Sequence, residues 1–304
     1  MQTKQKVRHS PHNPYKLLPI PSPMKVKKQT VLIITLLVIT LLSYGNILTN
    51  GFVWDDAEFI VGRATTTTVS EVGESFSTPE FGIYRPVRTL TYYLTYQLFG
   101  LNPALYHLFS LILHSAAVLL IYFTLNHLFN QKLAFFSSLF FAVFTIHVGR
   151  VSNATGSFDL VGILFYLATF YCYIVFRQNN RKNVFFVSLL LFIIGLFASE
   201  ELFSLPFLIA AYEFVFHRKE LTKKFSYVYY FVILFLFAIF RFFILDIGSR
   251  RTEYPGGSFI VAMLSMPKAF VDYIFTSFFP FALSPFREVT FVSNIFSLWF
   301  IIPI

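Results

Sequence analysis

Residues 30–48 read TVLIITLLVITLLSYGNIL, and this run of 19 residues contains no charged side chain. As an α-helix it would extend about 28 Å, close to the ~30 Å thickness of a bilayer hydrocarbon core. The run therefore predicts a first membrane span. Other apolar segments follow it along the chain, at about 104–126, 133–148, 158–176, 184–198, 202–216 and 226–246, with a less clear one at 258–280.

The composition supports the same interpretation for the chain as a whole. Of the 304 residues, 56% are hydrophobic, 20% are aromatic and only 13% are charged, whereas a soluble domain carries roughly 25% charged residues. One soluble core could not bury so much apolar surface. We therefore predict an all-α integral membrane protein, a polytopic helical bundle of about 7–9 spans with a long first extracytoplasmic loop.

The distribution of positive charge predicts the topology and argues against nucleic acid as a partner. The net charge is +9, but the basic residues lie in the N-terminal segment and in alternate short loops. By the positive-inside rule these loops and the N-terminus are cytoplasmic. We expect a disordered basic tail over 1–28, then a polytopic membrane domain over 29–304 that includes the outer loop 49–103, with the lipid bilayer as a partner.

Two adjacent carboxylates, Asp55 and Asp56, follow the first span in the segment NGFVWDD. Most acids of the chain fall on the outer side of this topology, which indicates that the outer face performs the chemistry. A carboxylate there can act as a general base toward an acceptor hydroxyl, and a pair can instead bind a divalent cation. The alternative is a solvated acidic loop without a catalytic role.

Further charged groups and histidines are expected to converge on the same side. An arginine can bind phosphate bidentately, although Arg85 and Arg88 could instead anchor the loop at the membrane surface. Asp159 could be functional or simply pair with Arg150, and a single buried histidine is more often structural. Glu200 and Glu201 lie between two short apolar segments, which would place them below the outer membrane surface. The candidate binding residues are Arg85, Arg88, His107, His147, Arg150, Asp159, Glu200 and Glu201.

The order of these motifs resembles the GT-C glycosyltransferases. The series comprises FVWDD at 52–56, YRP at 84–86, GLNP at 100–103 followed by Tyr106, His107 and His114, then His147, Gly156 and Asp159, SEE at 199–201 and FPFALS at 279–284. The resemblance is closest to the transmembrane O-mannosyltransferase-like branch, whose eukaryotic members carry C-terminal tetratricopeptide repeats.

The resemblance implies a membrane glycosyltransferase that inverts the sugar's configuration and takes the sugar, mannose in this branch, from a polyprenyl-phosphate carrier. It places the base at Asp55 or Asp56. It implies a protein or glycan acceptor on the extracytoplasmic side. It implies no certain cofactor, and the one candidate is a divalent cation bound by Asp55 and Asp56. Two cations of the branch are replaced here, by Ser157 and Glu200, so phosphate binding would shift to Arg85, Arg88, Arg150, Arg250 or Lys268.

Two alternatives to an active transferase stay open. The chain could keep the fold and bind a lipid carrier or a partner without catalysis. It could also be a transporter, although the sequence shows no internal repeat of the kind that many transporters have. The chain also stops inside an apolar run, so we expect a truncated or unusually short relative of the branch.

Overall fold

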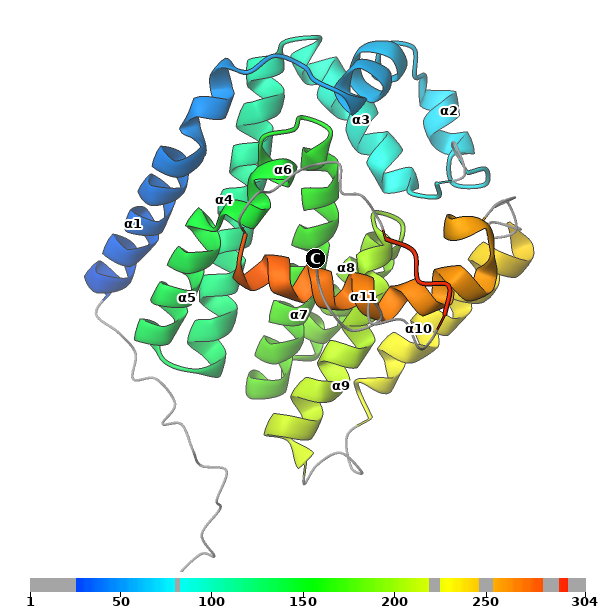
Figure 1. Ribbon diagram of the computed structural model, residues 1–304. Coiled ribbons are helices and arrows are strands. Elements are labelled where there is room, and N and C mark those ends of the chain that lie inside the picture. Colours follow the sequence, from blue (N-terminus) through cyan, green and yellow to red (C-terminus); the bar gives the residue numbers. More distant parts are fainter. Residues whose placement is uncertain (1–25, 80–82, 219–224, 246–253, 281–289, 295–304) are drawn as a thin grey trace, which may run out of the picture.

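The computed structural model describes residues 26–79, 83–218, 225–245, 254–280 and 290–294. Within these ranges the chain is helical and forms no β-strand, which confirms the predicted all-α membrane fold. The long helices stand side by side as a bundle (Figure 1). The bundle comprises α1 (Val26–Tyr44), α4 (Pro103–Leu128), α5 (Gln131–Val143), α7 (Gly156–Asn179), α8 (Lys182–Leu196), α9 (Leu205–Phe216) and α10 (Val228–Ile239).

Helix α7 is the centre of the bundle because it packs against α4 on one side and α8 on the other. Glycines permit the closest approaches. A Cβ atom at Gly162 would lie 2.5 Å from the Cβ of Ser199, and one at Gly195 would lie 2.1 Å from a methyl group of Leu202. The first contact holds the turn between α8 and α9 against α7, and the second holds the same turn against α8. This turn carries two of the predicted site residues.

Four helices are long and apolar enough to cross a membrane, or five when a bent pair is counted as one span. They are α1 continued by η1 (Gly45–Thr49), α4, α7 and α11 (Phe259–Phe278), with α5 belonging to the bent pair. Helices α8, α9 and α10 lie where apolar segments were predicted, but each is short. The chain is thus a multi-pass membrane protein, while the predicted number of about 7–9 spans stays a prediction.

The predicted span at 133–148 is broken. Helix α5 ends at Val143, Phe144 is extended, and the chain continues at an angle of 47° through η3 (Thr145–His147) and α6 (Val148–Val151). The break brings Arg150 to the start of α7. The predicted span is therefore not one continuous helix, although its apolar run continues through the break.

The loop 49–103, predicted to be extracytoplasmic, is largely helical and forms a cap over one end of the bundle (Figure 1). The cap comprises η2 (Ala57–Ala64), α2 (Val69–Glu74) and α3 (Pro86–Phe99). A capping box between Thr68 and Glu71 starts α2, and Pro86 starts α3, where its missing N–H costs nothing. Helix α3 alone has 14 residues.

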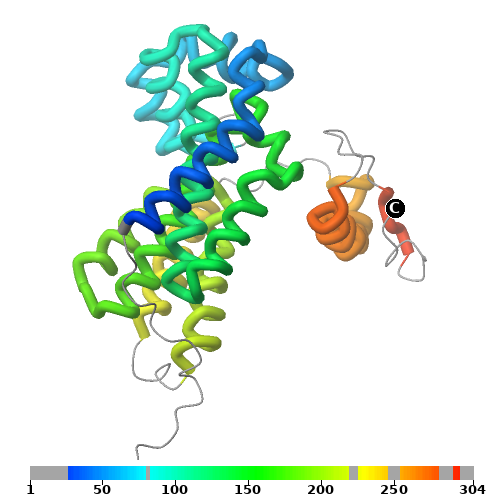
Figure 2. The backbone as a smooth tube through the Cα atoms, turned by 90° about the vertical axis from the view of Figure 1, so that its left-hand side faces the viewer, coloured from blue at the N-terminus to red at the C-terminus, as the bar shows by residue number. Residues whose placement is uncertain are grey.

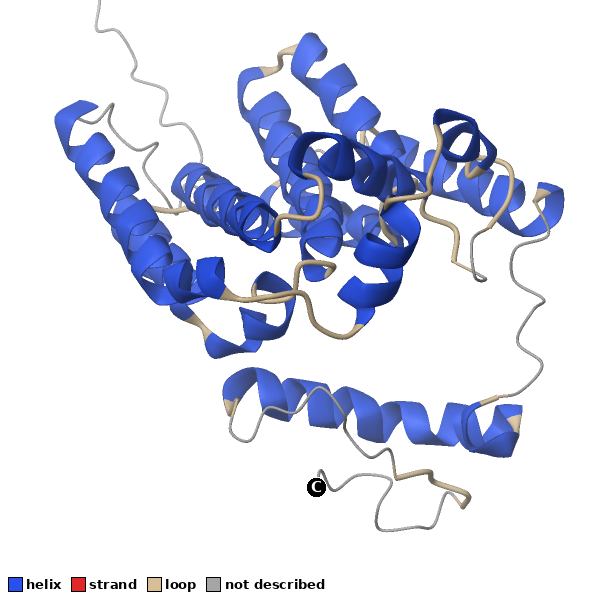
Figure 3. Ribbon diagram, turned by 90° about the horizontal axis from the view of Figure 1, so that it is seen from above, coloured by secondary structure: helices blue, strands red, loops and turns tan. Residues whose placement is uncertain are grey.

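Helix α11 lies apart from the bundle (Figures 2 and 3). It follows η7 (Pro255–Gly257) and η6 (Phe240–Ile244), and among the described elements it makes its main contacts with η7 alone. Lys268, a predicted candidate for phosphate binding, is buried in α11 and pairs with Asp272 at 3.3 Å. Lys268 is therefore not a member of the site described below.

A buried ion pair joins α7 to α9 near the end of the bundle away from the cap. Arg177 and Glu213 form a bidentate pair in which Nη2 donates to Oε2 at 2.9 Å, and the side chains are only 2% and 0% exposed. The Tyr173 hydroxyl donates to the same carboxylate at 2.7 Å and also contacts the Ser226 hydroxyl. The pair is completely shielded from solvent, so its integrity should matter for stability.

Candidate active site

The two adjacent carboxylates that follow η1 differ in burial and in hydrogen bonding. Asp56 is fully buried, and its two oxygens accept the backbone N–H groups of Val53 at 2.9 Å and Thr155 at 2.8 Å. These bonds tie the loop after α1 to the segment before α7. Asp55 is exposed, and no described side chain or backbone group forms a hydrogen bond or ion pair with it. The sequence left both open as the base; in the structure the Asp56 carboxylate is committed to backbone hydrogen bonds, whereas that of Asp55 is not.

The residue directly before the two carboxylates, Trp54, has a strained backbone. Its φ of 51° is in the left-handed region, which an aromatic residue rarely adopts. Asp55 and Asp56 follow this residue at the start of a helical segment, Asp55 exposed and Asp56 buried. The Trp54 side chain itself is more than half exposed. The strained residue is thus followed by a carboxylate on the cap side that has no partner among the described groups.

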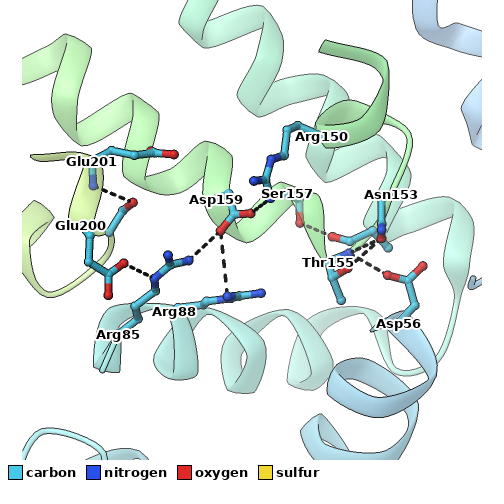
Figure 4. A network of polar contacts seen from close by, with 12 residues as sticks. Asp56, Arg85, Arg88, Arg150, Asn153, Thr155, Ser157, Asp159, Glu200 and Glu201 are labelled. Atoms are coloured by element: carbon cyan, nitrogen blue, oxygen red, sulfur yellow. Dashed lines mark hydrogen bonds and ion pairs between the residues drawn. The ribbon is translucent and has the colours of Figure 1, made fainter. Parts of the chain in front are cut away.

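Arg85 is the central cation of the site (Figure 4). Its Nε donates to Oε2 of Glu200 at 2.6 Å, and its Nη1 donates to Oδ1 of Asp159 at 3.0 Å. These partners come from η4 (Glu200–Ser204), between α8 and α9, and from the first turn of α7. Three segments that are distant in sequence thus meet at one guanidinium.

Asp159 is shared by further arginines. Arg150 forms an ion pair with its other oxygen, Oδ2, and Arg88 lies 3.9 Å from Oδ1. Arg88 is oriented by contacts within α3 and with η2. Its Nε donates to the Tyr92 hydroxyl at 3.1 Å, and its guanidinium lies 5.6 Å from the centre of the Phe59 ring. The expected Arg150–Asp159 pair is present, but it is one part of a larger network.

Glu200 has a second partner, Arg241, whose Nη2 donates to Oε1 at 2.8 Å. Within the described residues the ion-pair network therefore joins four guanidinium groups, those of Arg85, Arg88, Arg150 and Arg241, to two carboxylates. Burial opposes the charged form of Glu200, but the two guanidiniums outweigh it and lower the pKa of this carboxyl. Burial likewise opposes the charged form of Arg85, and Glu200 raises its pKa in return. The surplus of positive charge favours an anionic ligand.

Two glycines let the network form. A Cβ atom at Gly156 would lie 2.4 Å from the Arg150 carbonyl oxygen, so the turn from α6 into α7 closes tightly only with glycine there. Gly162, one turn after Asp159, permits the contact with Ser199 that brings the neighbouring Glu200 toward Arg85. Ser157 stands where the branch that this sequence resembles has a cation. It is buried, and its hydroxyl donates to the Ala154 carbonyl.

A small pocket opens beside the network between η2 and α3. Arg85 and Arg88 line it on the α3 side and Phe59 and Arg63 on the η2 side. Phe59 and Tyr92, which also line the pocket, contact Arg88. Because η2 begins directly after Asp56, the pocket and Asp55 lie on the same cap. A phosphate group in this pocket would face three arginines, Arg63, Arg85 and Arg88, and the rings of Phe59 and Tyr92.

The remaining predicted residues are placed as follows. Glu201 is exposed next to the network, and desolvation together with the Asp159 charge raises its pKa. His107 is fully buried in α4, and neither ring nitrogen has a hydrogen-bond partner among the described residues. The His147 ring packs against the rings of His114 and Phe141. No contact within the described ranges joins either histidine to the arginine network, and Arg250 lies outside those ranges.

The residues do not form a ready site for a divalent cation. Both Asp56 oxygens already accept backbone N–H groups, so Asp55 has no second free carboxylate beside it with which to bind a cation. In the part of the chain that the structure describes, no group of three or more His, Cys, Asp or Glu side chains is placed to hold a metal ion. We therefore assign the carboxylates no metal.

Arg241 is the residue that sequence reasoning missed. It lies in the predicted span 226–246 and was counted there as part of an apolar segment. The available signal was the charge itself, because an arginine inside an apolar run is costly and marks a functional position. Its partner could not be deduced, since Glu200 is 41 residues away in the chain.

A multi-pass helical membrane protein with a helical first loop and a cluster of arginines and carboxylates beneath it has the architecture expected of GT-C glycosyltransferases. Comparison with protein families agrees: the model of the dolichyl-phosphate-mannose-protein mannosyltransferase family matches residues 85–242. The chain belongs to this family. The matched region begins at Arg85 and includes every arginine and carboxylate of the ion-pair network described above.

Relatives with curated names place it in the transmembrane O-mannosyltransferase-like branch. Protein O-mannosyl-transferase F38B6.6 of Caenorhabditis elegans is 31% identical over 201 residues, which cover 61% of this chain and 28% of the relative. Human protein O-mannosyl-transferase TMTC3 is 34% identical over 141 residues, which cover 43% of this chain and 15% of the relative. The chain thus matches less than a third of the length of these relatives. No solved structure matches it.

Proposed function

We propose that the chain is a membrane glycosyltransferase that transfers a sugar, mannose by analogy with its named relatives, from a polyprenyl-phosphate-linked donor to a hydroxyl group of a protein or glycan. The observation that carries the proposal is the arginine network, in which four guanidiniums share two carboxylates beside a pocket. Guanidinium groups bind phosphate oxygens bidentately and stabilise a phosphate leaving group.

In the proposed mechanism Asp55 acts as the general base. Its carboxylate takes the proton of the acceptor hydroxyl while that oxygen attacks the anomeric carbon of the sugar. The bond between the anomeric carbon and the phosphate oxygen breaks, and the lipid phosphate leaves with its electron pair. Arg85 and Arg88, which line the pocket, would stabilise the charge of the leaving phosphate.

The second candidate function is binding of the lipid carrier without catalysis. The observation in its favour is that Arg85 is already bound by Glu200 and Asp159. The two functions are separated by assaying transfer of labelled mannose from dolichyl-phosphate and undecaprenyl-phosphate donors into membranes that express this chain. Transfer above that of membranes without the chain would support the enzyme; saturable donor binding without transfer would support the carrier protein.

We further propose that the cap faces the extracytoplasmic side and that the N-terminal tail, 1–28, is cytoplasmic. The cap and the basic turns containing Lys132 and Arg181 lie at opposite ends of the bundle (Figure 1). Glu58, in η2, is exposed. In a Cys172→Ser background, which removes the chain's single cysteine, Glu58→Cys should therefore react with an impermeant thiol reagent in intact cells. A cysteine at Arg181 is the matched control and should react only after permeabilisation. The reverse pattern would exclude this topology.

Arg85→Lys is expected to reduce transfer by about 10- to 100-fold, the equivalent of one charge-assisted hydrogen bond. Lysine keeps the charge but cannot reach Glu200, Asp159 and a phosphate with one planar group. The measurement is the rate of transfer at increasing donor concentration. Arg181→Lys, an exposed arginine in the turn after α7 at the opposite end of the bundle, is the control. An Arg85→Lys variant with unchanged apparent donor affinity and maximal rate would remove Arg85 from the site.

A further inference from the structure

Glu200 stands between two arginines that differ in their surroundings. Its Oε2 binds Arg85 and its Oε1 binds Arg241, at 2.6 and 2.8 Å. Arg85 and Glu200 are partly exposed, with 25% and 32% of their side-chain surface accessible, whereas Arg241 is only 10% accessible. The same carboxylate thus connects a guanidinium that a ligand can reach to one that it cannot.

Arg241 is held in an aromatic enclosure. Its guanidinium carbon lies 5.9 Å from the Tyr84 ring centre and 5.7 Å from that of Phe203. Nε and Nη1 are buried and have no hydrogen-bond partner among the described residues. The arginine therefore keeps unused donors close to Glu200. Rotation of that carboxylate toward Arg241 would satisfy some of them, which removes part of the cost of burying unpaired N–H groups.

Arg85 is in the opposite situation. It lines the pocket, but its Nε and Nη1 donors are already occupied by Glu200 and Asp159. Nη2 has no hydrogen-bond partner among the described residues, but a phosphate that binds bidentately through the Nε–Nη2 edge must displace Glu200 from Nε. Asp159 is also held by Arg150 and is near Arg88. Either carboxylate would keep another arginine on leaving Arg85, but only the second arginine of Glu200, Arg241, has buried donors without a partner among the described residues.

We propose that Glu200 is an internal competitor for the monophosphate group of the lipid-linked donor, and that Arg241 receives Glu200 when the donor displaces it from Arg85. The proposal rests on the proposed function for the identity of the ligand. In the empty site Glu200 occupies Arg85; in the loaded site the phosphate takes its place, and the carboxylate turns fully to Arg241. Arg241 is then a positioning residue, since it acts on the ligand only through Glu200.

The competition predicts opposite effects for the two members of the pair. Glu200→Gln removes the competing charge and should raise affinity for a prenyl monophosphate by about tenfold. Arg241→Met leaves Glu200 with Arg85 alone and should lower affinity by a similar factor. In the double variant the Arg241 substitution should have no further effect, because the group on which it acts is gone. A Glu200 that merely aims Arg85 would give the reverse result for Glu200→Gln.

The experiment measures binding of farnesyl phosphate to the purified full chain in lipid nanodiscs. Glu201→Gln is the matched control, because it removes a neighbouring negative charge that makes no ion pair among the described residues. It should change affinity much less than Glu200→Gln. Farnesol tests the need for the phosphate, and inorganic phosphate as competitor shows whether the lipid chain contributes.

Each outcome decides one question. Weaker or unchanged binding in Glu200→Gln, or an equal gain in Glu201→Gln, would overturn the internal competitor. A full effect of Arg241→Met in the Glu200→Gln background would overturn the role of Arg241. If Arg241→Met does not fold, Arg241→Gln replaces it and the Glu200→Gln result still decides the competition. Absence of saturable binding by the wild type and by every variant would instead refute the proposed donor.

Discussion

Asp55→Asn is expected to reduce sugar transfer by about 10²–10⁴-fold, the usual loss when general-base assistance is removed. Asparagine keeps the shape of the side chain but cannot accept the proton of an acceptor hydroxyl. Asp55 is exposed and has no partner among the described groups, so the substitution should leave the thermal stability of the purified chain unchanged. The measurements are the initial rate of mannose transfer and the unfolding temperature in detergent.

Asp56→Asn provides the contrasting result. Its two oxygens accept backbone N–H groups of Val53 and Thr155 while fully buried, and an amide nitrogen would face one of these donors. We expect a loss of stability of about 1–3 kcal/mol. Normal transfer by Asp55→Asn, together with a specific loss in a folded Asp56→Asn, would move the base to Asp56 and contradict our assignment.

The helical membrane fold could be predicted from the sequence because hydropathy follows directly from composition. Segments such as 104–126 and 158–176 became α4 and α7 with small shifts of their ends. Helix α3 was not predicted, because its buried residues include Thr89, Tyr92 and Thr95 and hydropathy does not mark a polar buried face. The break at Phe144 was missed for the opposite reason, since the apolar run continues through it.

Most members of the ion-pair network were candidates from the sequence, but their contacts with one another could not be predicted. Arg85, Asp159 and Glu200 were candidates, yet hydropathy cannot show that one guanidinium binds both carboxylates. The difference between Asp55 and Asp56 was also out of reach, because Asp56 is held by a backbone N–H almost 100 residues away, at Thr155. Tertiary contacts between distant segments determine both features.

Arg177→Met is expected to destabilise the folded chain by about 3–5 kcal/mol, the usual cost of removing one member of a buried ion pair. Methionine has a similar length but leaves the Glu213 carboxylate, which is 0% exposed, without its bidentate partner. The Tyr173 hydroxyl cannot neutralise that charge. The measurement is denaturant unfolding in mixed micelles. Arg181→Met, at an exposed position in the turn after α7, is the control and should change the unfolding free energy little.

The double variant Arg177→Met/Glu213→Leu tests the physical cause. If the loss arises from an uncompensated buried charge, removing that charge as well should recover most of the stability, because an apolar pair of similar volume is often as stable as a buried ion pair. Tyr173 would keep the Ser226 hydroxyl as a hydrogen-bond partner. Equal or greater destabilisation in the double variant would show instead that the two side chains contribute through packing between α7 and α9. Because the pair lies at the end of the bundle away from the cap, the double variant should retain sugar transfer if it folds, which separates the stability of the bundle from the chemistry of the arginine network.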